Sequence, residues 1–200
     1  MFLGTFSGIA AATFPMGMPI DVSVAGWRTD LLIDNSLIII TVLFLIKLTW
    51  MLWACFRHGE SHTAHFDHGD SRNWTIAKLS IGGFIFFGVD GYLFANSTAD
   101  LSKTTWNFEE YENDPRTIRI ELNAHQWAWD TRLAGPDGKF NTKDDIVSLN
   151  DVTIPVNTPI LMQMTSTDVL HSFYIPNLRV KQDVVPGNVI WTRFQAKGTG

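Results

Sequence analysis

Hydrophobic residues follow two different patterns along the 200-residue chain. From Leu31 to Phe56 the sequence is apolar almost without interruption, and a second apolar run extends from Trp74 to Phe94. A helix rises ~1.5 Å per residue, so each run of roughly 20 to 25 residues can cross a hydrocarbon layer ~30 Å thick. The pattern therefore predicts two transmembrane helices joined by a short polar loop.

Charged residues in and beside the spans refine this prediction. Trp50 and Trp53 lie near one end of the first span, as interfacial aromatic residues do, and Arg57 follows it. Lys47 and Asp90 lie inside the spans, where a charge facing lipid is costly. Lys47 must therefore reach water or face a neighbouring subunit, and Asp90 is interpreted as an acid near the outer helix end rather than as part of a proton path.

The loop between the spans is rich in histidine. Spacings of three to four could align imidazoles on one helix face and form a metal site, whereas Gly59 and Gly69 disfavour such a helix and predict a solvated loop. Arg57 and Arg72 bracket the loop and indicate the cytoplasmic side, so both chain ends would lie outside. The histidines are His58, His62, His65 and His68.

After Asp100 the pattern changes to alternation of apolar and polar residues, which is typical of half-buried strands. Short strands separated by Pro, Gly, Asn and Asp turns predict an antiparallel sandwich or barrel. In the last strand the apolar residues are Val189, Trp191 and Phe194. Strands are expected in TIRIELNA (117–124), DVTIPVN (151–157), PILMQMTST (159–167) and NVIWTRFQ (188–195).

The segment AGPDGKFNTKDDIVSLND (134–151) carries several acids that could bind calcium. Their spacing fails the EF-hand pattern, and Pro-Asp-Gly is a strong turn signal, so a plain hairpin excursion is expected. Met1 to Met18 is apolar, and the first basic residue is Arg28, so this stretch is interpreted as a non-helical arm rather than an export signal. The expected parts are an N-terminal arm (1–30), a helical hairpin (31–96) and a β-domain (97–200).

Composition excludes two classes of function. The net charge is −5 and there is no cluster of Lys and Arg, which argues against nucleic-acid binding. An acidic outer domain instead suits a basic protein partner. Cys55 is the single cysteine, so the chain cannot form an internal disulfide or supply two thiolates to a metal.

Two stretches carry a family resemblance. NAHQWAWD (123–130) and TSTDVLHSFYIPNLRVKQDVVPG (165–187), placed after two apolar spans, resemble subunit II of bacterial and mitochondrial haem-copper cytochrome c oxidases. The pattern D-V-x-H-S-F followed by D-x-x-P-G is specific to that family. The resemblance implies a transmembrane helical hairpin followed by an all-β cupredoxin-like sandwich, in the bacterial inner membrane as a multi-pass protein with the β-domain on the periplasmic side.

The resemblance also implies a role in respiration. Such a subunit accepts electrons from cytochrome c at a dinuclear copper centre, CuA, and passes them to haem a in subunit I. Oxygen reduction and proton pumping take place in subunit I, so no catalytic residue is expected in this chain. The implied partners are subunits I and III, cytochrome c and the lipid bilayer.

Four residues receive roles from the resemblance. His171 corresponds to a CuA ligand, and imidazole is a donor that copper favours; the simpler alternative is a core histidine bonded to the backbone. Trp127 corresponds to the aromatic residue through which cytochrome c passes its electron, with sheet packing as the alternative. Asp168 corresponds to an acid near the docking surface, and Asp183 lies in the segment that faces subunit I, near a possible magnesium site. Ala128 replaces an aromatic residue that is usual between the two tryptophans.

The sequence departs from the family in its metal ligands. The remaining ligands of the family come from a loop C-x-E-x-C-x-x-x-H-x-x-M that these 200 residues do not contain, and Cys55 lies on a membrane helix far from the β-domain. Three explanations compete. A truncated sequence is favoured, because a sandwich without its last strands leaves an exposed sheet edge and an open core. A subunit split into two polypeptides is second, and a copper-free quinol-oxidase type subunit is third, because such subunits usually lack the histidine that is present here as His171. A membrane-tethered structural β-domain is the rival from another class. No acid lies at residues 73–75, where the family has a proton-entry glutamate, and Asp70 is the nearest substitute, so that role stays unassigned.

Overall fold

The computed structural model describes residues 18–59, 62–63, 66, 68–69 and 71–199. The chain divides into two compact units. One unit contains residues 31–99, and the other contains the residues up to Asp30 together with those from Asp100 onward. His65 and Asp70 lie outside the described residues, as does most of the expected N-terminal arm.

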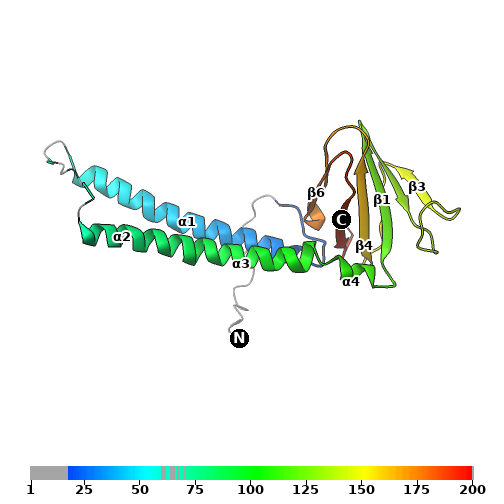
Figure 1. Ribbon diagram of the computed structural model, residues 1–200, viewed down its shortest axis with the longest axis horizontal. Helices are drawn as coiled ribbons and strands as arrows, with labels where there is room; N and C mark the ends of the chain where they lie inside the picture. The colour runs from blue at the N-terminus through cyan, green and yellow to red at the C-terminus, as the bar shows by residue number, and fades with distance from the viewer. Residues whose placement is uncertain (1–17, 60–61, 64–65, 67, 70, 200) are drawn as a thin grey trace. The chain divides into compact units, whose positions relative to one another are not determined.

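Two long helices follow the two apolar runs (Figure 1). The first is α1, Gly26–Arg57. The second is a continuous stretch made of α2 (Arg72–Gly83), the π-helical η1 (Phe84–Asp90), α3 (Gly91–Asp100) and the π-helical η2 (Leu101–Thr105). Both are long and apolar enough, by length and composition, to cross a membrane. The two predicted spans are therefore present as helices.

The helices are longer than the predicted spans. Helix α1 begins five residues before Leu31, because the Ser23 side-chain oxygen accepts a hydrogen bond from the Gly26 N–H at 2.6 Å and caps its first turn. The second helix continues to Thr105, beyond the apolar run that ends at Phe94. Hydrophobicity located the apolar part of each helix but not its polar ends.

Five strands form the larger sheet of the β-domain, in the order β3-β2-β1-β4-β7. Strands β1 and β4 pair in parallel, and the other neighbours are antiparallel. A short helix, α4 (Phe108–Glu112), precedes this sheet. The strands are β1 (Ile118–His125), β2 (Ala128–Leu133), β3 (Ile146–Leu149), β4 (Pro159–Ser166) and β7 (Ile190–Gln195).

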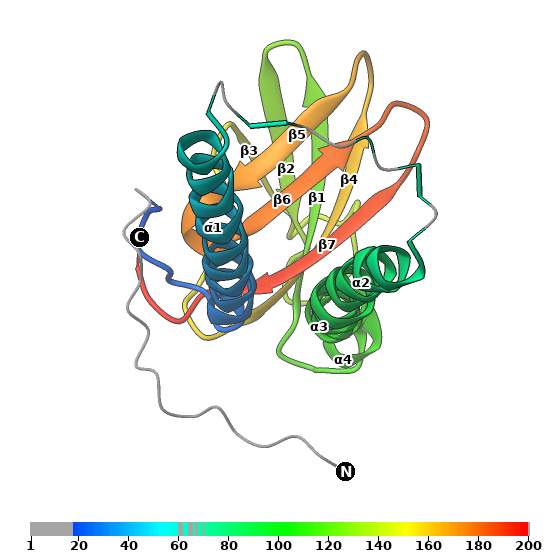
Figure 2. The same ribbon diagram turned by 90° about the vertical axis from the view of Figure 1, so that its left-hand side faces the viewer.

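A second, two-stranded sheet lies over one face of the first (Figure 2). It consists of β5 (His171–Ile175) and β6 (Val180–Val184), joined by a 3-10 turn at Pro176–Leu178. The core lies between the two sheets, and β1 supplies Ile120, Leu122 and Ala124 to it, the alternation predicted from TIRIELNA. Phe173 and Val184 close the core from the smaller sheet. The predicted all-β domain after two apolar helices is confirmed.

Several details of the predicted strands were wrong. Residues 151–155 of DVTIPVN form no strand, and Pro155 has no N–H to give to a ladder. The predicted last strand begins at Ile190, so Val189 lies just outside it; within β7, Phe194 is buried and Trp191 is exposed. The excursion at 134–151 is a hairpin, as predicted, since β3 pairs antiparallel with β2; Gly138 occupies a left-handed turn position with φ +65°.

Residues 18–25, the N-terminal strap, run along the open edge of β7. The Val24 N–H donates to the Gln195 carbonyl at 3.0 Å, and the Lys197 N–H donates to the Val22 carbonyl at 2.7 Å. Arg179, in the turn before β6, donates to both carboxylate oxygens of Asp30 at 2.7 and 3.1 Å and to the carbonyls of Pro19 and Pro176. The start of α1 is therefore tied to both sheets.

Candidate functional site

The predicted site residues gather where β1 turns into β2 and β4 turns into β5. His171 is the first residue of β5, and its side chain is 16% exposed. Its Nε2 lies 2.7 Å from Oδ1 of Asp168, in the preceding turn. The structure thus brings together His171 and Asp168, which the sequence had assigned to separate roles.

The Asp168 carboxylate is held by a set of hydrogen bonds. Besides His171, the Val169 N–H donates to Oδ1 at 2.6 Å, and the Gln126 N–H donates to Oδ2 at 2.6 Å. The hydrogen bond from His171, followed by those from the two backbone amides, outweighs desolvation and holds the pKa of Asp168 far below its ordinary range. Asp168 is therefore a carboxylate at neutral pH.

The charge of Asp168 determines which nitrogen of His171 carries the proton. An ionised carboxylate can only accept hydrogen bonds, so Nε2 of a neutral His171 must carry the hydrogen. The Nδ1 atom then keeps its lone pair and makes no hydrogen bond in the part of the chain that the structure describes. A histidine whose second nitrogen donates to a carboxylate is the usual arrangement of a metal-binding imidazole.

Two tryptophans lie beside this pair in different environments. Trp127 lies in the β1–β2 turn with 89% of its surface exposed, so the alternative of a packed sheet aromatic does not hold for it. Trp129 is half-buried in β2, and its ring makes edge contacts with the rings of His171 and Phe173, at centroid distances of 5.7 and 6.0 Å. The contact between Trp129 and His171 was not predicted, because the turn at residues 126–127 breaks the alternation that would place both tryptophans on one face.

Asp183 is not part of this group. It lies exposed on β6, paired in register with Ser172 rather than with His171. Among the described residues, no group of three or more His, Cys, Asp and Glu side chains is arranged to hold a metal ion. That statement covers His58, His62 and His68 of the loop as well as the described acids of the hairpin at 134–151. Cys55 is exposed near the far end of α1, in the other compact unit.

Comparison with known proteins identifies the β-domain. Residues 137–200 match the family model described as cytochrome c oxidase subunit II, periplasmic domain. An alternative cytochrome c oxidase subunit 2 from Bradyrhizobium diazoefficiens is 35% identical over 104 residues, a match that covers 40% of this chain and 38% of that protein. Residues 137–200 of this chain are therefore similar to the periplasmic domain of subunit II.

Two solved structures of subunit II are also similar. The crystal structure of the periplasmic domain of subunit II of cytochrome oxidase (CoxB) of Bradyrhizobium japonicum is 29% identical, with 42% of this chain and 66% of that chain covered and a TM-score of 0.34. The mixed disulfide intermediate between a thioredoxin-like protein and subunit II of cytochrome c oxidase gives 29% identity, coverages of 42% and 64%, and a TM-score of 0.33. The subunit II-like chain spans less than half the length of its curated relative.

Proposed function

We propose that this subunit II-like protein accepts electrons from cytochrome c at a CuA centre and delivers them to haem a of subunit I. The observation that carries the proposal is the His171–Asp168 pair, which leaves one imidazole nitrogen available beside the exposed Trp127 turn. Copper is a metal for which imidazole is a suitable donor, so His171 fits the centre as one ligand. The further ligands of the family pattern do not lie within these 200 residues.

The residues of the chain would serve such a centre in distinct ways. Asp168 fixes the ring orientation and the tautomer of His171 through its 2.7 Å contact. The same carboxylate bonds the amide of Gln126, next to Trp127, so one side chain holds the metal ligand and the electron-entry residue. Copper itself supplies a one-electron carrier. In this proposal Trp127 is the residue through which the electron enters. Asp168 also contributes to the docking surface for a basic cytochrome c, and Asp183 lies at the interface with subunit I, near a magnesium site.

The membrane setting completes the proposal. Helix α1 and the helix from Arg72 to Thr105 would span a bacterial inner membrane, with the β-domain on the periplasmic side and subunits I and III as neighbours in the bilayer. Oxygen chemistry and proton translocation would belong to subunit I. A subunit II-like domain that binds no copper would instead be a quinol-oxidase type subunit or a structural membrane-tethered domain.

The test is copper loading of the full-length protein, followed by near-infrared and EPR spectroscopy. A mixed-valence dicopper signature that disappears in His171→Asn would support the proposal. His125→Asn is the matched control, because His125 is a β1 histidine that contacts Asp130 at 3.3 Å rather than Asp168. Isolated type 2 copper, or a dicopper signal that depends on His125 and not on His171, would sink the assignment.

A further inference from the structure

A pocket remote from His171 has a charge pattern that the proposed electron transfer does not use. It lies between the N-terminal strap, the first turn of α1, residues Thr104–Thr105 and the edges of β6 and β7. Its volume is about 120 Å³. A cavity needs only ~10–15 Å³ of such volume to hold one water molecule, so the pocket has room for several waters or for a group the size of a phosphate.

Most residues that line the pocket are uncharged, and its charged residues are all basic. They are Arg179, Lys181 and Arg193. The charge of Arg179 is balanced by Asp30, with which it forms a bidentate ion pair. Lys181 is exposed, and its side chain makes no hydrogen bond or ion pair in the described part of the chain. Lys181 is thus the basic residue of the pocket without an acidic partner there, whereas Arg193 has a looser one, Glu110 at 3.7 Å, and lies over the Tyr111 ring.

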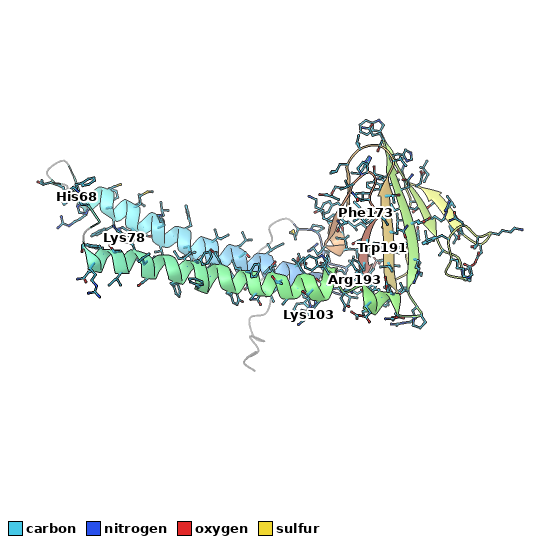
Figure 3. All side chains as sticks on the ribbon, viewed as in Figure 1. His68, Lys78, Lys103, Phe173, Trp191 and Arg193 are labelled. Atoms are coloured by element: carbon cyan, nitrogen blue, oxygen red, sulfur yellow. The ribbon has the colours of Figure 1, made fainter. Side chains whose placement is uncertain are left out.

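Arg193 is buried but incompletely paired. Only 5% of its side chain is exposed. Its Nη2 donates to the carbonyl of Lys103, a residue labelled with it in Figure 3. Its Nη1 lies 3.7 Å from the Glu110 carboxylate, which is too long for a hydrogen bond, and its buried Nε has no partner. A guanidinium carries five N–H groups, so Arg193 keeps N–H groups that could bond an anion in the adjoining pocket through its Nη atoms.

The sequence places the pocket at the level of lipid headgroups. Thr29, on the pocket wall, precedes the first apolar run by two residues, and Thr104–Thr105 end the second long helix. Beside them Trp27 and Trp106 are 52% and 61% exposed. Exposed tryptophans at the ends of membrane helices mark the interface between lipid and water.

We propose that this pocket binds the phosphate of an anionic phospholipid headgroup. The proposal rests on the membrane location inferred above, but not on copper. Lys181 and Arg193 would contact the phosphate, and Trp27 and Trp106 would lie among the acyl-chain ends nearest the headgroups. The bound lipid would fix the start of α1 against the β-domain at the membrane surface.

Native mass spectrometry of the detergent-solubilised full-length protein, with the subunits that co-purify, tests the proposal. The protein is titrated with phosphatidylglycerol, with phosphatidylcholine and with inorganic phosphate. Phosphatidylglycerol should bind more tightly than phosphatidylcholine, and inorganic phosphate should not displace it. A cation near a membrane surface contributes ~1 kcal/mol, so Lys181→Gln should weaken phosphatidylglycerol binding about fivefold, as should Arg193→Gln if it folds. Lys139→Gln, the same change on the distant hairpin, should leave binding unchanged.

Three results would overturn the lipid assignment. The first is equal affinity for phosphatidylglycerol and phosphatidylcholine. The second is an equal effect of Lys181→Gln and Lys139→Gln on phosphatidylglycerol binding. The third is that Lys181→Gln weakens the binding of inorganic phosphate but not that of the lipid. Alkaline carbonate extraction separates this failure from failure of the membrane location. If the protein stays in the membrane but shows no lipid preference, only the pocket proposal fails. If carbonate releases the protein, the pocket proposal and the proposed membrane location both fail.

Discussion

Replacing Arg179 tests how the start of α1 is fixed to the β-domain. Its side chain is 8% exposed, and it makes two hydrogen bonds to Asp30 and two to backbone carbonyls. Arg179→Ala removes all four and leaves Asp30, which is 25% exposed, without its cation. The expected loss of unfolding free energy is about 3 kcal/mol, the lower end of the range for a broken buried pair, because Asp30 can be partly rehydrated.

A second substitution at the same position separates the lost contacts from backbone strain. Arg179 has φ +57°, in the left-handed region, where a side chain costs about 1 kcal/mol relative to glycine. Arg179→Gly loses the same contacts but relieves this strain, so its loss should be about 2 kcal/mol. At ~4 °C per kcal/mol for a domain of this size, the expected decreases in Tm are about 12 °C for alanine and about 8 °C for glycine.

The assay is thermal unfolding of the full-length protein in detergent, followed by near-ultraviolet circular dichroism and tryptophan fluorescence. Arg116→Ala is the control, because the Arg116 side chain is 71% exposed and its pair with Asp114 joins residues only two apart. That control should leave Tm unchanged. A Tm decrease for Arg179→Ala no greater than for the control would refute the role of Arg179, and equal decreases for alanine and glycine would refute the strain argument.

Three further outcomes are expected. Burial alone would raise the pKa of Asp21, but hydrogen bonds from Ser23 and Lys197 hold it below its ordinary value. The ionised carboxylate therefore contributes its full stability above the unfolded Asp pKa of ~3.9, and this stability is lost as the pH falls through the lower native pKa. Asp21→Asn should accordingly make the acid unfolding curve, followed by tryptophan fluorescence, less steep. Leu122→Ala in the core, where Leu122 is 1% exposed, should cost about 3 kcal/mol in urea unfolding, whereas Leu149→Ala at an exposed position should cost under ~0.5 kcal/mol. Trp127→Phe should leave Tm unchanged but slow copper reduction by cytochrome c in stopped-flow experiments, and an unchanged rate would argue against electron entry at this residue.

The sequence predicted the parts of the fold that depend on local pattern. Unbroken apolar runs identified both long helices, and period-two alternation located β1, β4 and the buried Phe194 of β7. Strands β5 and β6 were not predicted as strands, because they are short and only Phe173 and Val184 among their residues are buried. Their pairing depends on the core that they cover, which a local pattern does not record.

The candidate site was predicted in its residues but not in its connections. The motif around His171 identified that residue, Asp168 and Trp127, yet it gave no sign that one carboxylate bonds both the imidazole and the turn before Trp127. That contact joins positions more than 40 residues apart in the chain. The pocket at Lys181 and Arg193 was not anticipated at all, because its walls come from four separate segments.

The N-terminal strap sets the order of events during biogenesis. Val22 is among the first described residues to leave the ribosome, yet its partner Lys197 follows about 175 residues later. Contacts between such distant positions form late, since the intervening loop must be closed first. The first helix would therefore enter the bilayer before β7 has been synthesised, and Val22 and Val24 would have to wait for Lys197 and Gln195 before these hydrogen bonds can form.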